Sequence, residues 1–286
     1  MNNKYIFTGP LEIKPEEMAP LLLSTAENLK NDSIFVISFS QDSLVLGVNQ
    51  SIEDLVENWD SRDCLVFTRR ITGGAAYAHK SGGTMCIAFF NENKNEIGPG
   101  YLTRNGQKVV DYLRFIGADV SLAMGFYSLN DNGTVKRKSG FYIINENKET
   151  IGTMAGVIVP PSNQTGPSTN ISQTCLRLKE MTRTEAELVV GSMKSYDGLD
   201  VGIYMQKTAS LERMDIHFSI DEVVLSFQEF LSKGGNQLIN CPETTKVLET
   251  EKYKTPLWKE GGLRLGLCGY NKGRDAGVFK EFKELY

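Results

Sequence analysis

The sequence has little histidine and no closely spaced cysteines. Two histidines and five cysteines occur in 286 residues, without a CxxC motif or a local group of cysteine and histidine. The cysteines are odd in number and widely spread, so their spacing supports neither a disulfide framework nor a structural zinc site. We therefore expect free thiols and no metal. The five positions are Cys64, Cys86, Cys175, Cys241 and Cys268.

Long apolar runs and an excess of positive charge are also lacking. No run approaches the roughly 20 apolar residues of a membrane span. The first residues, MNNKYIFTGPLEIKPEE, have neither the basic region nor the apolar core of a signal peptide, so we expect a cytoplasmic protein without membrane association. A net charge of -4, with basic residues spread along the chain, argues against nucleic acid and favours a protein or small-molecule partner.

What is present is an ordinary globular composition with the periodicities of both helices and strands. Hydrophobic residues make up 41% and charged residues 23%, enough for a core that folds without disulfides. Helical runs alternate with groups of strands that we expect to be antiparallel, which favours an α+β fold. The expected helices are a first one that begins near Pro15, then 51–59, 105–116 and 219–233. One expected hairpin pairs residues 34–40 with 43–50. A second pairs 141–145 with 151–159 across the polar tip ENKET.

One loop concentrates unusual residues. The stretch RRITGGAAYAH, residues 69–79, follows the apolar run CLVF and contains two arginines, two adjacent glycines and a histidine. Glycine lets backbone N–H groups approach a ligand closely, and arginine supplies charge for a carboxylate or phosphate. The stretch is either an anion-binding loop or a tight turn with surface arginines.

This stretch resembles the RRxSGGGAVxH motif of the superfamily of lipoate-protein ligase A, octanoyltransferases and biotin ligases. Thr72 stands for the motif's serine and Ala75 for its third glycine. Upstream, SLVLGVNQSIEDLVE is similar to the family's strand that ends in G-x-x-Q, and EKYKTPLW (251–258) is similar to its K-Y-x-x-x-x-W segment. The resemblance implies a mixed, largely antiparallel β-sheet with flanking helices, forming a catalytic domain over residues 1–260. Residues 261–286 would be a short extension in place of an accessory domain.

The resemblance also implies roles for individual residues. Arg70 would contact the acyl or adenylate group, and His79 would close the loop or serve there only as a structural hydrogen-bonding group. The implied substrate-binding set is Arg70, Thr72, Gly73, Gly74, Ala75, His79 and Gly152. Lipoate or octanoate would be the substrate, with ATP and Mg²⁺ in a ligase. The partners would be a lipoyl carrier domain or a glycine-cleavage H-like acceptor protein, and a separate accessory subunit is possible in this family.

The sequence departs from the family's pattern where its chemistry is concentrated. The family's K-I-x-G-x-A strand carries a lysine that holds the acyl carboxylate and phosphate, but KETIGTMAG has Thr150 or Glu149 at that position. Lys148 is the nearest candidate for a catalytic cation, and only a bulge at the turn would bring it to the correct face. Lys80 stands where the family has an acid and is a second candidate, with Lys136 and Lys138 next.

A thiol could carry the acyl group instead of a nucleotide. Octanoyltransferases of the same superfamily use a cysteine, but Gly125 stands at the similar position here, and Cys175 is the thiol nearest the later part of the site. We predict that the chain attaches lipoate or octanoate to a lysine of a lipoyl carrier domain, through an acyl-adenylate or by acyl transfer. The alternative is a non-catalytic homologue that binds an acyl ligand or a partner protein.

Overall fold

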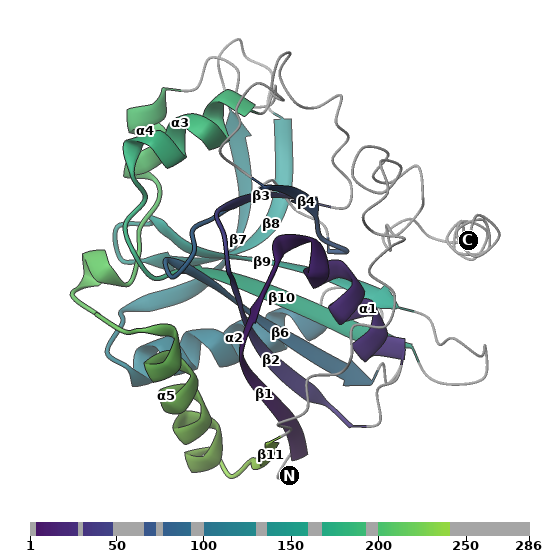
Figure 1. Ribbon diagram of the computed structural model, residues 1–286. Coiled ribbons are helices and arrows are strands. Elements are labelled where there is room, and N and C mark those ends of the chain that lie inside the picture. Colours follow the sequence, from purple (N-terminus) through teal and green to yellow (C-terminus); the bar gives the residue numbers. More distant parts are fainter. Residues whose placement is uncertain are drawn as a thin grey trace, which may run out of the picture.

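A computed structural model describes residues 4–27, 31–47, 66–72, 77–92, 100–129, 136–159, 168–192 and 200–240. Its centre is an eight-stranded sheet in the order β11-β1-β2-β6-β10-β9-β8-β7, and a three-stranded sheet, β4-β3-β5, lies beside it (Figure 1). The strands are β1 Lys4–Ile13, β2 Ser33–Phe39, β3 Ser43–Leu46, β4 Val66–Arg69, β5 Tyr77–His79, β6 Thr84–Glu92, β7 Val120–Leu129, β8 Lys136–Asn145, β9 Thr150–Val159, β10 Thr169–Arg177 and β11 Gln237–Asn240.

The described helices flank the large sheet or connect its strands. They are α1 Met18–Glu27, α2 Gly100–Phe115, α3 Arg183–Ser192, α4 Val201–Gln206 and α5 Ile220–Lys233, with short 3-10 turns at Pro15–Glu17 and Glu212–Met214. In the large sheet β1 pairs in parallel with β2 and β11, and the pairs from β2 to β7 are antiparallel. The predicted α+β class with a mixed, largely antiparallel sheet is therefore confirmed.

The large sheet is apolar on both faces because successive side chains of a strand point to opposite sides. On β6, Cys86, Ala88 and Phe90 belong to a first core under α1 and the small sheet. The intervening Met85, Ile87 and Phe89 belong to a second core under α2 and α5. Figure 1 shows α1 on one side of the sheet, with α2 and α5 on the other. The first face is the one that carries the candidate site.

Several local predictions are confirmed. The helix at 219–233 has Ser219 as its N-cap, in a capping box with Glu222, and Gly234 as its C-cap. Gly117 follows α2 with a φ of 97°, a conformation that glycine adopts without strain. The strands β8 and β9 form the predicted hairpin around residues 146–149.

The predicted pairing of residues 34–40 with 43–50 is wrong. Both segments contain strands, but β2 pairs with β1 on one edge and β6 on the other. A strand has only two hydrogen-bonding edges, so β2 has none left for β3. Instead, β3 pairs with β4 and β5 in the small sheet. The hairpin pattern was present in the sequence, but competition for the edges of β2 decided the outcome.

Gly156 shows how closely α2 packs on the second face. A Cβ built there would collide with the Tyr101 hydroxyl and lie 2.6 Å from Leu102 Cδ2 and 2.9 Å from the backbone oxygen of Ile171. We expect Gly156→Val to destabilise the protein by about 1–3 kcal/mol, because the backbone oxygen cannot move away. Gly100→Ala is the matched control, since a Cβ there meets nothing within 4 Å. Urea unfolding of both variants checks this, and equal stabilities would contradict it.

Candidate functional site

The stretch RRITGGAAYAH connects two strands of the small sheet over the first face of the large one. Arg69 ends β4 and His79 ends β5, and both strands pair with β3. Gly73, Gly74 and Ala75 lie outside the described residues. The same holds for Gln50, the predicted helix 51–59, the segment 251–258 and the extension 261–286. The described parts on either side of the glycines nevertheless define where this loop begins and ends.

Two of the predicted substrate-binding residues are buried just before the glycines. The Arg70 side chain is 6% exposed, and its Nη1 donates to the backbone oxygen of Val45 at 3.2 Å. Thr72 is fully buried, and its Oγ1 donates to Oε1 of Gln173 on β10 at 3.1 Å. The Gln173 Nε2 lies 3.0 Å from the Met18 sulfur on α1. A surface turn with exposed arginines is therefore not what this segment forms at Arg70.

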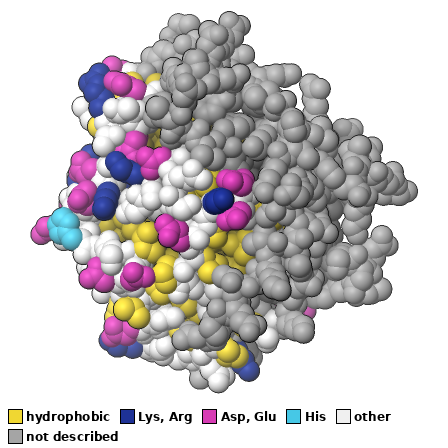
Figure 2. Space-filling view, viewed as in Figure 1, with side chains coloured by type: hydrophobic (Ala, Val, Ile, Leu, Met, Phe, Trp, Pro, Cys, Tyr) yellow, Lys and Arg dark blue, Asp and Glu magenta, His cyan; other side chains and the backbone are white. Residues whose placement is uncertain are grey.

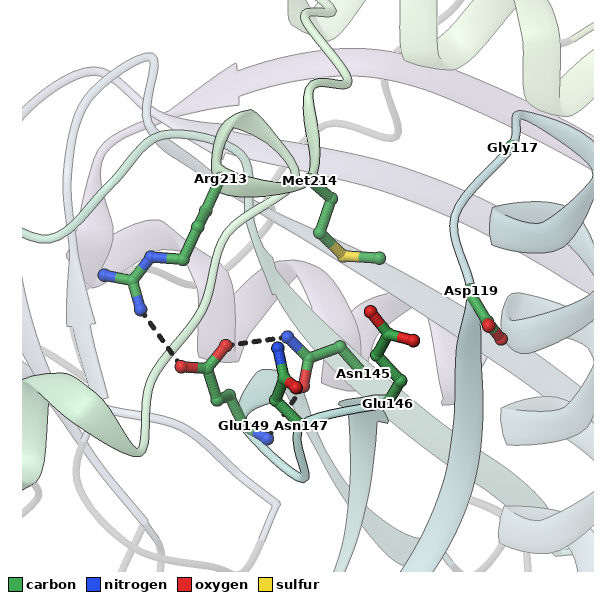
Figure 3. A pocket seen from close by; sticks show the side chains of 8 residues that line it. All are labelled: Gly117, Asp119, Asn145, Glu146, Asn147, Glu149, Arg213 and Met214. Carbon is green, nitrogen blue, oxygen red and sulfur yellow. Dashed lines mark hydrogen bonds and ion pairs between the residues drawn. The ribbon is translucent and has the colours of Figure 1, made fainter.

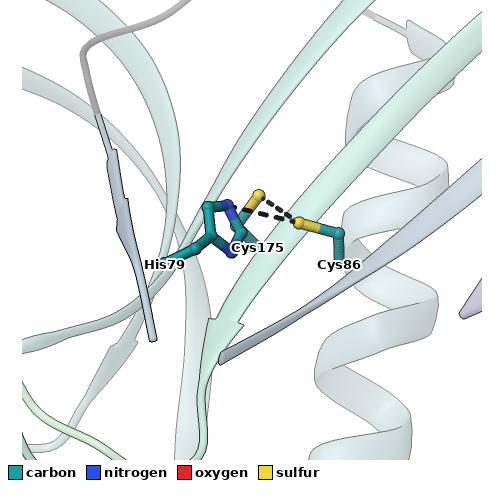
Figure 4. A group of neighbouring side chains, drawn as sticks. All are labelled: His79, Cys86 and Cys175. Carbon is teal, nitrogen blue, oxygen red and sulfur yellow. Dashed lines mark hydrogen bonds between the residues drawn. The ribbon is translucent and has the colours of Figure 1, made fainter. Parts of the chain in front are cut away.

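Beyond the glycines, His79 meets two cysteines that are distant in sequence. Cys86 and Cys175 are directly opposite each other on β6 and β10, with their sulfurs 2.7 Å apart. The Cys86 sulfur is 3.7 Å from His79 Nε2. Figure 4 shows the three side chains pointing toward one another. All three residues are buried, and their potential ligand atoms lie within 4.8 Å of one another. The spacing of cysteine and histidine in the sequence did not indicate this group. The pairing of β6 with β10 brings Cys86 and Cys175 together although they are 89 residues apart.

The surroundings affect the two thiols in opposite directions. Burial raises the pKa of the Cys86 thiol. A hydrogen bond from Cys86 holds the pKa of Cys175 below its usual range, and His79 and the charge of Arg70 act in the same direction. Both cysteines are free, as the sequence predicts. Two hydrogen-bonded thiol groups beside an imidazole are suited either to nucleophilic attack or to binding a metal ion.

Arg177 is a functional candidate that sequence reasoning missed. It ends β10, two residues after Cys175, so it lies on the same face of the sheet. Its side chain is 4% exposed, and the guanidinium carbon lies 5.4 Å from the centre of the Tyr77 ring. Among the described residues, Arg70 and Arg177 are the two basic side chains that are buried. The alternation of β10 was the available signal, because it places Gln173, Cys175 and Arg177 in one row.

The positions expected to hold the family's lysine lie at the β8–β9 turn. Glu149 accepts a hydrogen bond from Asn145 Nδ2 at 2.7 Å and forms an ion pair with Arg213 at 3.5 Å. Lys148 is exposed at the tip of the turn with a φ of 61°. The strands β8 and β9 change register between Ile143 and Ile144, so a bulge does occur. Because Ile143 packs in the second core, this bulge places Thr150, paired with Ile144, on the first face.

The remaining predicted residues have other surroundings. Lys80 forms an ion pair with Glu185 on α3 at 3.7 Å. A Cβ at Gly152 would lie 2.6 Å from Leu176 Cδ2 in the second core, so the missing side chain points away from His79. The backbones of Lys136 and Lys138 pair with Leu129 and Tyr127, toward the end of β8 opposite the turn.

A cavity of about 380 Å³ lies away from the glycine loop. Figure 3 shows it at the β8–β9 turn, with the side chains of Asp119, Glu146 and Glu149 around it. Arg213 contributes one cation, which is paired with Glu149. An excess of carboxylates would repel an acyl carboxylate or a phosphate. The buried residues around Arg70 and Arg177 are therefore better suited to bind an anion.

Figure 2 shows that acidic and basic side chains are interspersed on the visible part of the described surface.

The architecture is that of the lipoate-protein ligases. A lipoate protein ligase from Thermoplasma acidophilum, part of a bi-partite archaeal lipoylation system, matches with a TM-score of 0.66 and 16% identity, over 92% of this chain and 98% of that chain. A lipoate-protein ligase A bound with ATP gives a TM-score of 0.64 and 16% identity over 92% and 100%. LipL1 from P. falciparum in complex with lipoate gives a TM-score of 0.57 and 13% identity, over 90% of this chain and 74% of that chain.

These likenesses establish the fold of the chain, and the fold is the one that the glycine-loop motif implies. A scan against protein-family models finds no match, and a search of curated proteins finds none. Within the described residues, no helix is both long and apolar enough to cross a membrane. The activity of the chain is therefore argued from its own residues.

Proposed function

We propose that this chain binds lipoate or octanoate and attaches it to a lysine of a lipoyl carrier domain. The observation that carries the proposal is the burial of two arginines, Arg70 and Arg177, beside the glycine loop. Among the described residues, no carboxylate forms an ion pair with Arg177. The Tyr77 hydroxyl beneath it is buried and has no hydrogen-bond partner in the part of the chain that the structure describes. Burying an uncompensated charge is costly, so a bound anion is the expected complement.

Arg70 and Arg177 supply the charge that the family's lysine would otherwise provide. Arg70 precedes the glycines and Arg177 of β10 lies beside Tyr77, which follows them, so a carboxylate held between the two could accept hydrogen bonds from two guanidinium groups. Thr72, Gly73, Gly74 and Ala75 would line the acyl group from the loop. The same charges suit the phosphate of an adenylate, which makes the ATP-dependent reaction our leading form of the proposal.

ATP would supply the activating group in this reaction. The two buried guanidinium groups fit its phosphate oxygens. The one group of three potential metal ligands among the described residues is His79, Cys86 and Cys175. These residues of the chain would orient the acyl carboxylate and exclude water, while the nucleotide provides the leaving group.

A non-catalytic acyl-binding protein is the second candidate, and a specific observation favours it. The two positions expected to hold the catalytic lysine are Thr150 and Glu149, and Glu149 is already paired with Asn145 and Arg213. In this case the pocket would retain affinity for the acyl chain and its carboxylate without activating it. Recognition of the carrier domain, with or without an accessory subunit, would then be the remaining function.

The decisive experiment is mass spectrometry of a lipoyl carrier domain after incubation with the chain. One reaction contains ATP, Mg²⁺ and lipoate, and the other contains octanoyl carrier protein. Modification in the first reaction indicates a ligase, and modification in the second alone indicates a transferase. If neither modifies the carrier while calorimetry detects lipoate or octanoate binding, the chain is a binding protein.

Ligand binding has its own expected result. Lipoate at 100 times its dissociation constant should stabilise the native state by about 2.7 kcal/mol and raise the melting temperature accordingly. Thermal unfolding with lipoate, octanoate or a non-hydrolysable lipoyl-adenylate analogue measures this. Absence of a shift, together with absence of calorimetric binding at millimolar concentration for all three, would contradict both forms of the proposal.

A further inference from the structure

The group formed by His79, Cys86 and Cys175 combines three potential metal ligands from two sheets. His79 ends β5 of the small sheet, whereas Cys86 and Cys175 lie on β6 and β10 of the large one. All three are at most 5% exposed, and their ligand atoms lie within 4.8 Å of one another (Figure 4). An imidazole and two thiols form a donor set that Zn²⁺ prefers.

We propose that His79, Cys86 and Cys175 bind one Zn²⁺ ion that joins the small sheet to the large sheet beside the glycine loop. This goes beyond the proposed acyl-transfer function, and it assigns the His79 side chain to the ion instead of the substrate. Two thiolates and one Zn²⁺ have no net charge, so the bound site can stay buried without a further counter-ion.

One of the two distances among the ligand atoms fits a tetrahedral site, and the other requires a cysteine side chain to move. With Zn–S near 2.3 Å and Zn–N near 2.0 Å, a sulfur and a nitrogen ligand lie about 3.5 Å apart and two sulfurs about 3.8 Å. The separation of Cys86 Sγ and His79 Nε2 is 3.7 Å, which already fits. The two sulfurs are 2.7 Å apart, so one must move by about 1 Å, which rotation of a cysteine side chain can supply.

The surroundings of the three ligands also suit an ion. On β10, Gln173 precedes Cys175 by two residues and accepts a hydrogen bond from Thr72, so the row of residues beside the ligands is held by polar contacts. The His79 ring is held between Phe39, with ring centres 4.4 Å apart, and Tyr77, at 4.9 Å. A nucleophilic Cys175 would have to be reached by a large acyl thioester, but its side chain lies deep under the small sheet.

The test measures metal in the full chain, expressed with zinc in the medium and purified anaerobically with a non-chelating reductant. We expect close to one zinc atom per chain by elemental mass spectrometry, and a thiolate-to-metal charge-transfer band after replacement by Co²⁺. Cys86→Ser and Cys175→Ser should each reduce the zinc content at least about tenfold. His217→Ala is the matched control, because this other histidine is 64% exposed, and it should keep the zinc.

Wild-type measurements keep the proposal testable if a variant does not fold. X-ray absorption at the zinc edge should show two sulfur ligands and one nitrogen ligand. Zinc below about 0.1 atom per chain, both after growth and after titration with Zn²⁺, would overturn the proposal, as would a Cys86–Cys175 disulfide in the metal-free protein isolated under reductant. If the wild-type chain binds zinc but does not modify the carrier domain, the result counts against the proposed function and not against the zinc site.

Discussion

Replacing Arg177 by methionine is expected to lower acyl-adenylate formation by about 10²- to 10³-fold, the usual effect of removing one preorganised charge from such a site. The reason is that Arg177 is one of two buried cations on the first face and forms no ion pair with a described carboxylate. Methionine keeps the length and apolar bulk of the side chain. Pyrophosphate release with lipoate and ATP gives the rate, and calorimetry gives lipoate affinity if the chain is non-catalytic.

Stability separates a ligand-binding role of Arg177 from a structural one. Replacing an unpaired buried charge by an apolar side chain is often neutral or stabilising, so the melting temperature of Arg177→Met should be unchanged or higher. Arg183→Met is the matched control, because Arg183 is an exposed arginine on α3 paired with Glu187. Unchanged activity and lipoate affinity in Arg177→Met would show that the anion is held elsewhere.

The lysines provide a competing explanation within the same experiment. If Lys148 or Lys80 supplies the catalytic cation, its replacement by alanine should cost about 10²-fold while Arg177→Met costs little. We expect the opposite, because Lys148 is exposed at a turn and Lys80 is paired with Glu185. The Thr150→Lys variant tests whether a cation on β9 increases the activity, since the bulge places Thr150 on the first face.

Replacing Phe227 by alanine is expected to destabilise the protein by about 3–5 kcal/mol, the range for an aromatic side chain lost from a packed core. Phe227 is fully buried on α5, with its ring centre 4.7 Å from that of Tyr112 on α2 and 6.1 Å from that of Phe7 on β1. Its removal would open a cavity where α5, α2 and the large sheet meet.

Leu225 is the matched control for Phe227 on the same helix. It is 66% exposed, so Leu225→Ala should change the free energy of unfolding by no more than about 0.5 kcal/mol. Urea unfolding monitored by circular dichroism measures both variants. If the two differ by less than about 1 kcal/mol, α5 does not pack as described.

Local sequence patterns predicted those features that depend on neighbours along the chain. Ser219 and Gly234 bound α5 because capping uses backbone groups within a few residues. The polar tip between β8 and β9 forms a hairpin for the same reason. The glycine-loop motif led to the correct fold through its resemblance to that of the lipoate-protein ligases, whose architecture this chain shares. The pairing of β2 and β3 failed because partner choice depends on strands far away in sequence.

By itself, the sequence determined several of the helices and strands, where some of them end, and which loop concentrates arginine and glycine. Those properties follow from backbone preferences and from the period of apolar residues. Only the tertiary structure decided that Cys86 faces Cys175, that His79 joins them, and that Arg177 is the buried cation over Tyr77. The physical reason is strand register: each of these contacts joins different strands, and no local interaction sets which residues stand opposite one another in a sheet.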